Sequence, residues 1–145
     1  MDRAGTVNNV KKGEIVIFSD EIGWHTDELQ IGLNLSGIKT RILNLSSIDI
    51  FIDCTKDNFV IRNFNTSPSC CFVRGIEGGT LEQVTRRLAI LHQLEFLGIP
   101  IVNSGKGIEN SVDKCMTSFL LRMQDISTPD CWTLEDKSTS IQLIN

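Results

Sequence analysis

The stretch Cys70–Gln83, CCFVRGIEGGTLEQ, decides the fold. It begins with a short apolar run typical of a buried strand and passes through a glycine-rich turn to Thr80–Gln83, which has the spacing of a helix capping box. Apolar residues then recur every three or four positions, which predicts one apolar helix face. They are Leu81, Val84, Leu88, Leu91 and Leu94. Gly98 and Pro100 end this helix, and Ile99–Val102 predicts the next strand, completing a βαβ unit.

A similar unit precedes this one. Glu14–Phe18 predicts a buried strand, Thr26 is a candidate cap for a helix that ends at Gly37, and Lys39–Leu45 predicts another strand. Two βαβ units predict an α/β fold with an open, mostly parallel sheet.

The segment between the two units carries weaker signals. Ile48, Ile50 and Ile52 alternate with polar residues, Phe59–Ile61 is a candidate partner strand, and Asn65–Ser69 predicts a loop.

The chain is expected to divide near residue 104. Residues 1–13 are interpreted as a leader, 14–104 as an α/β domain, and 105–145 as a second domain that starts but is not completed, because forty residues are too few for a second core. In the last part, Asn110 or Ser111 is a candidate cap for a further helix, and Cys131–Leu134 is a candidate strand. The apolar stripe expected on that helix consists of Val112, Met116, Phe119, Leu120 and Met123.

Composition excludes several function classes. The 145 residues carry 14 Lys and Arg against 18 Asp and Glu, a net charge of −4, which argues against broad nucleic-acid binding. The apolar runs are too short for a membrane helix, and no signal core is seen, so a cytoplasmic location is expected. Five cysteines without a CxxC pair and two histidines do not support a metal site, and the thiols are expected to be reduced and structural.

Ligands of open α/β sheets bind beyond the carboxyl ends of the strands, where three segments of this chain fall. The first carries Trp24 and His25; a packing anchor is favoured for Trp24, and His25 is either functional or a solvated or capping group. The second carries Arg74, which either binds an anionic ligand or pairs with Glu77 or Glu82. The third is Asn103–Glu109.

Lys114 is a further candidate, because a cation in the first turn of a helix opposes the helix dipole unless a phosphate approaches that terminus. An ordinary solvated lysine is the alternative. Gly105-Lys106-Gly107 does not fit a phosphate loop, because GxxxxGK requires glycine where Pro100 stands, and Gly75–Gly79 lacks the dinucleotide GxGxxG spacing. No catalytic triad or pair of carboxylates is indicated by spacing.

Seven short segments follow one another along the chain in the order Val73-Arg74-Gly75, Gly79–Val84, Leu91–Glu95, Gly98–Ser104, Ile108-Glu109, Asp113-Lys114 and Thr128-Pro129. In these segments the chain resembles the ATP-grasp superfamily, specifically the RimK-like α-L-glutamate ligases. Phe18–His25 is similar to the family's first strand and loop.

The resemblance implies a Rossmann-like pre-ATP-grasp domain followed by an incomplete ATP-grasp domain. Complete enzymes of this family use ATP and Mg²⁺ to join a small-molecule or peptide carboxylate to an amine. By the resemblance, Lys114 contacts ATP phosphate, and Arg74 with the Gly75–Gly79 turn faces the substrate cleft. Trp24, His25 and Asn103 are further substrate-binding candidates.

The chain departs from the family's pattern after about Glu135. A second ATP-binding lysine, a phosphate-covering glycine loop and the Mg²⁺ ligands of the family do not follow in the sequence. The resemblance therefore implies the amino-terminal part of a ligase that does not catalyse ligation alone. The alternative is a non-catalytic α/β binding or interaction module. If the faces of Phe119, Leu120 and Met123 lack their partner domain, the segment after Asn110 is expected to be mobile or to self-associate.

Overall fold

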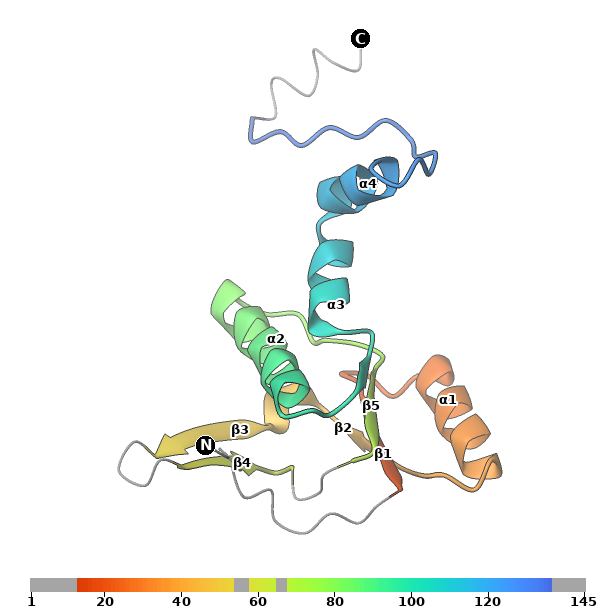
Figure 1. Ribbon diagram of the computed structural model, residues 1–145, viewed down its shortest axis with the longest axis vertical. Coiled ribbons are helices and arrows are strands. Elements are labelled where there is room, and N and C mark those ends of the chain that lie inside the picture. The colour runs from red at the N-terminus through yellow and green to blue at the C-terminus, as the bar shows by residue number, and fades with distance from the viewer. Residues whose placement is uncertain (1–12, 54–57, 65–67, 137–145) are drawn as a thin grey trace. The chain divides into compact units, whose positions relative to one another are not determined.

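The computed structural model of the protein describes residues 13–53, 58–64 and 68–136 and divides the chain into two compact units, Met1–Gly105 and Lys106–Asn145 (Figure 1). Except for Gly13, the predicted leader lies outside the described residues. No helix within the described ranges is both long enough and apolar enough to cross a membrane.

The first unit is built on a four-stranded parallel sheet with the order β2-β1-β5-β6. The strands are β1 (Glu14–Phe18), β2 (Lys39–Leu43), β5 (Cys70–Val73) and β6 (Ile101–Val102). Strand β1 lies inside the sheet, and its last three side chains, Val16, Ile17 and Phe18, are fully buried. Burial on both sides explains why β1 is an apolar run and not an alternating pattern. The predicted open parallel α/β sheet is confirmed.

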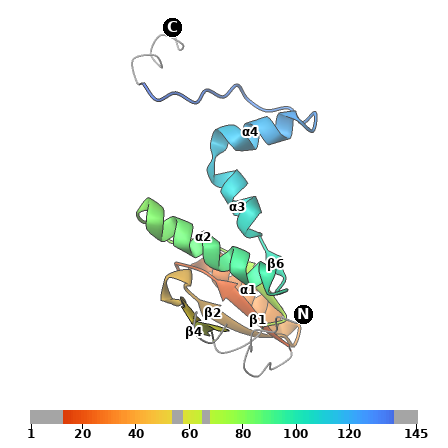
Figure 2. The same cartoon turned by 60° about the vertical axis from the view of Figure 1, so that its left-hand side comes forward.

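Two helices cover this sheet from opposite sides (Figures 1 and 2). Helix α1 (Trp24–Leu35) connects β1 to β2, and α2 (Leu81–Phe96) connects β5 to β6. Thr80 and Gln83 form the predicted capping box of α2, and Gly37 follows α1 with a φ of 76°, the left-handed conformation that favours glycine. The buried face of α2 consists of Arg87, Ile90, Leu91 and Leu94, whereas Leu81, predicted to be on that face, is exposed.

Strands β3 (Asp49–Asp53) and β4 (Asn58–Arg62) form a separate antiparallel pair after a short 3-10 turn, η1 (Leu45–Ser47). Ile50 stands opposite Ile61 in this register, so the predicted pairing is confirmed. Leu45, Ile48 and Phe64 of this segment are buried and add to the core of the first unit.

Two predictions for the last third of the chain are wrong. A single helix capped by Asn110 or Ser111 was expected, but α3 (Gly105–Val112) and α4 (Lys114–Arg122) are separate, because the Asp113 carboxylate accepts a hydrogen bond from the Met116 amide (2.9 Å) and starts a new helix. The expected strand at Cys131–Leu134 has no regular structure.

The four cysteines among the described residues, Cys70, Cys71, Cys115 and Cys131, are free thiols, and Cys54 lies outside that range. Burial raises the pKa of the Cys71 thiol to about 12, and it also raises the pKa of Cys70. The unfolded chain loses this proton near the usual pKa of 9.0, whereas the folded chain keeps it up to about pH 12. The contribution of the neutral Cys71 thiol to stability is therefore fully present below pH 9 and is lost as the pH rises toward 12.

We expect a large contrast in alkylation between two of these cysteines. At pH 8 only about 10⁻⁴ of a thiol with a pKa near 12 is ionised, and the thiolate is the nucleophile, so Cys71 is protected both by burial and by protonation. The exposed Cys131 provides the comparison in the same chain. Iodoacetamide labelling followed by peptide mass spectrometry should modify Cys131 long before Cys71. Equal labelling rates in the folded protein would contradict the burial of β5.

Candidate functional site

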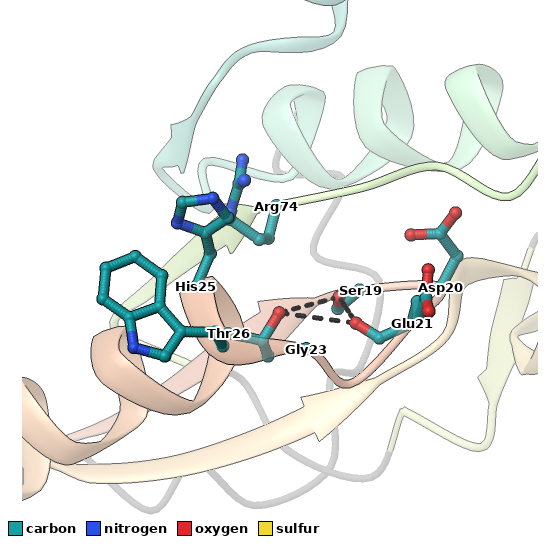
Figure 3. Close-up of a pocket in the computed structure, with 8 residues that line it drawn as sticks. Ser19, Asp20, Glu21, Gly23, His25, Thr26 and Arg74 are labelled. Carbon is teal, nitrogen blue, oxygen red and sulfur yellow. Dashed lines mark hydrogen bonds between the residues drawn. The ribbon is translucent and has the colours of Figure 1, made fainter.

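An open pocket of about 190 Å³ lies at the carboxyl ends of β1 and β5 (Figure 3). It is lined by Ser19, Asp20, Glu21, Gly23, Trp24, His25, Thr26 and Arg74. Parallel strands bring their carboxyl ends to one edge, so the loop after β1 and the first residue after β5 meet there although they are some fifty residues apart. The structure thereby brings three of the predicted site residues together: Trp24, His25 and Arg74.

Two buried hydroxyl groups shape the floor of the pocket. Ser19 donates a hydrogen bond to the Glu21 carbonyl (2.6 Å), and the Ser19 and Thr26 hydroxyls share another (3.1 Å). Thr26 also donates to the Glu21 carbonyl (3.4 Å), as the dashed lines in Figure 3 show. The sequence suggested Thr26 as the cap of α1, but Thr26 lies within the helix. Its side chain links the loop after β1 to the first turn of α1.

The first turn of α1 faces this loop without a side-chain cap. Gly23 occupies the N-cap position and makes no side-chain hydrogen bond, so the helix terminus keeps its positive end available. Trp24 is 69% exposed, and its ring meets the His25 ring edge-on at 4.8 Å between centroids. The interpretation of Trp24 as a packing anchor is wrong, because the side chain is on the surface of the pocket.

The backbone of Arg74 is fixed by a hydrogen bond, whereas its side chain is exposed and has no partner among the described residues. Its amide donates to the Phe18 carbonyl (2.7 Å), which fixes the residue against the end of β1. Among the described residues, its exposed guanidinium has neither a hydrogen bond nor an ion pair, and Arg74 lines the pocket together with His25 (Figure 3). The alternative pairing is not found: Glu77 pairs with Arg87, and the pKa of Glu82 is lowered by the backbone amide and the Thr80 hydroxyl at the start of α2.

Gly75 follows Arg74 and leaves room for a pocket residue. A Cβ atom at Gly75 would clash with the Asp20 carboxylate, which therefore lies directly against the backbone at this position. The Gly75 amide also donates to the Phe18 carbonyl (3.3 Å). Asp20 and Glu21 belong to the segment after β1, but their carboxylates were not predicted as site residues; two adjacent acids in a loop at the end of a parallel strand were the available signal.

Arg87 holds the glycine-rich turn that follows. Its guanidinium, buried on α2, donates to the carbonyls of Glu77 (2.5 Å) and Gly78 (3.1 Å) and pairs with the Glu77 carboxylate at 3.5 Å. Sequence reasoning missed this residue because an arginine in a helix is usually solvated. Its spacing was the available signal: Arg87 stands three residues after Val84 and four before Leu91, on the apolar face of α2.

The other two candidates lie outside the pocket. The side-chain amide of Asn103, a residue with a backbone φ of 60°, donates to the Val73 carbonyl (2.8 Å). The side chain therefore joins the ends of β5 and β6 and does not line the pocket. Lys114 belongs to the second unit, where it is the first residue of α4 and donates to the Ser111 carbonyl (3.0 Å). It lies in a first helical turn, as predicted.

Known proteins are similar to this chain in sequence and in fold. No protein-family model matches the chain. Over 126 residues it is 32% identical to the tetrahydromethanopterin:alpha-L-glutamate ligase of Methanococcus maripaludis, which covers 86% of this chain and 42% of the relative. The fold is similar to the ATP-grasp ligase PsnB complexed with minimal precursor, Mg and ADP (TM-score 0.63) and with minimal precursor (TM-score 0.60). In sequence the chain is similar to a glutamate ligase, and its fold is that of ATP-grasp ligases.

The chain spans less than half the length of that curated relative. The match to PsnB, at 15% identity, covers 94% of this chain and 50% of PsnB in the first structure, and 93% and 49% in the second. The described residues contain no group of three or more His, Cys, Asp or Glu side chains that could hold a metal ion. The exposed Lys114, at the start of α4, is a candidate contact for the phosphates of ATP.

Proposed function

We propose that this chain is the amino-terminal part of an ATP-dependent carboxylate–amine ligase of the RimK-like type, with glutamate as a substrate. The observation that carries the proposal is the 32% identity, maintained over 126 residues, to a ligase whose name gives alpha-L-glutamate as a substrate. The similarity to PsnB supports the same class, because PsnB is an ATP-grasp ligase with an equivalent fold over nearly all of this chain.

In this proposal the two units take different parts of the reaction. The pocket at Trp24, His25 and Arg74 holds a charged group of the substrate, where the guanidinium and the uncapped end of α1 both attract a carboxylate. Gly75 supports it by leaving room for the Asp20 carboxylate, and Asn103 by fixing the neighbouring strand ends. Lys114 provides one positive charge for ATP phosphate at the start of α4.

The chain by itself is proposed not to complete the reaction. Carboxylate activation by ATP develops charge that Mg²⁺ and several cations must stabilise, and the described residues supply one candidate cation and no metal-ligand group. The second unit contributes α4, which has nine residues, and all but the first residue of the eight-residue α3 to the described structure. ATP and Mg²⁺ are therefore cofactors of the complete enzyme in this proposal.

We expect weak, Lys114-dependent binding of ATP to the isolated chain. In an NMR titration with ATP and Mg²⁺, the dissociation constant should be millimolar, with shifts at the amides of residues 114–117. Lys114→Met should weaken binding about fivefold, the size of one exposed ionic contact. Lys106→Met is the matched control, because Lys106 is an exposed lysine of the same unit paired with Glu109. Micromolar affinity that survives Lys114→Met would overturn the assignment.

A further inference from the structure

The pocket at the end of β1 and β5 contains opposite charges that are not paired with each other. Arg74 contributes a guanidinium, and Asp20 and Glu21 contribute two carboxylates. Asp20 lies against Gly75, the residue next to Arg74, yet no ion pair joins Asp20 to Arg74 among the described residues. In Figure 3 the Asp20 carboxylate and the Arg74 guanidinium are drawn well apart. The positive and negative groups are thus held apart in one open pocket.

The positive end of the pocket suits a carboxylate. The Arg74 guanidinium presents planar donors that match carboxylate oxygens in pairs. The first amides of α1 add to this end, because Gly23 provides no side-chain cap and the first backbone bond of the helix comes from Thr26 (2.9 Å to the Gly23 carbonyl).

The negative end suits an ammonium group. Asp20 and Glu21 are exposed, and neither carboxylate has an ion-pair partner in the described part of the chain. With two acids and one arginine, the ionised groups of the pocket sum to −1, so a phosphate dianion would meet net repulsion. A carboxylate next to an ammonium group would satisfy both ends.

We infer that this pocket binds the zwitterionic head group of an α-amino acid, with the carboxylate at Arg74 and the first turn of α1 and the ammonium group at Asp20. The volume of about 190 Å³ is below the ~300 Å³ at which pockets for whole drug-sized ligands begin, and it suits a head group whose side chain extends outward. That the ligand is an α-amino acid is inferred from the pocket alone. That this amino acid is glutamate rests on the proposed ligase function.

The test compares three ligands by isothermal titration calorimetry with the full chain. L-Glutamate has both head-group charges, glutarate lacks the ammonium group, and 4-aminobutyrate lacks the α-carboxylate. We expect L-glutamate to bind about fivefold more tightly than either analogue, since each analogue loses one partly exposed ionic contact. Asp20→Asn should lower the affinity for L-glutamate to that for glutarate, and Arg74→Met should lower it to that for 4-aminobutyrate.

Matched controls remove the same charges elsewhere in the first unit. Lys39→Met acts at the amino-terminal end of β2, and Glu28→Gln acts on the exposed surface of α1; both should leave all three affinities unchanged. The inference is overturned if L-glutamate and glutarate bind equally to the native chain, or if Asp20→Asn leaves their ratio unchanged. L-Alanine binding as tightly as L-glutamate would support the head-group site while contradicting glutamate as the substrate of the proposed ligase. Because no ATP is present, a failed Lys114 titration leaves this test intact.

Discussion

Replacing Phe18 by alanine should lower the free energy of unfolding by about 4 kcal/mol, as large-to-small changes at fully buried phenylalanines do. Phe18 is the last residue of β1, is fully buried, and stacks against Phe64 at 6.1 Å between ring centroids. The loss combines the apolar area returned to water with the cavity left between the sheet and the segment around Phe64. Since domains are stabilised by ~5–15 kcal/mol in total, the variant should be near the limit of folding.

Urea denaturation followed by circular dichroism measures this effect, and Phe96→Ala is the matched control. Phe96 ends α2 and is 93% exposed, so the same chemical change there should cost less than about 0.5 kcal/mol. The Phe18 carbonyl also accepts the amides of Arg74 and Gly75, so amide exchange at these two residues should accelerate in Phe18→Ala. Equal destabilisation by the two substitutions would show that β1 is not the centre of the core.

The parallel sheet could be predicted because its strands and helices carry strong, local signals. The capping box at Thr80 and Gln83 and the apolar run of β1 each have one favourable backbone solution, and the structure adopts both. The break between α3 and α4 could not be predicted in the same way. Val112 and Met116 have helical spacing across the break, which is compatible with one continuous helix. The helix breaks because the Asp113 side chain caps α4 by accepting a hydrogen bond from the Met116 amide.

The site was predictable as a location but not as a set of charges. The rule that ligands lie beyond the carboxyl ends of parallel strands placed Trp24, His25 and Arg74 at one edge, and they do line one pocket. Which carboxylate pairs with which arginine depends on three-dimensional packing. Glu77 was an expected partner of Arg74, but the buried Arg87 takes it, and this leaves Arg74 open.

Arg87→Met should lower the free energy of unfolding by about 2 kcal/mol and loosen the turn at residues 75–79. Methionine fills a similar volume but leaves the carbonyls of Glu77 and Gly78 without their charged donor, and loss of a hydrogen bond to a charged group costs ~1.5–3 kcal/mol. The Cβ position of Gly79 lies close to Arg87 and Gln83, so this turn is built around the guanidinium. Amide hydrogen exchange across residues 75–80 should therefore accelerate more than exchange in β1.

The neighbouring arginine separates the effect of burial from the effect of charge. Arg86 also contacts a backbone carbonyl, that of Ile48, and pairs with Asp49 at 3.1 Å, but its side chain is 44% exposed, so water can replace it. Arg86→Met should therefore cost about 1 kcal/mol or less and leave the exchange of residues 75–80 unchanged. If the two variants lose equal stability, the buried donor at Arg87 is not what orders the turn, and the open position of Arg74 at the pocket would need another cause.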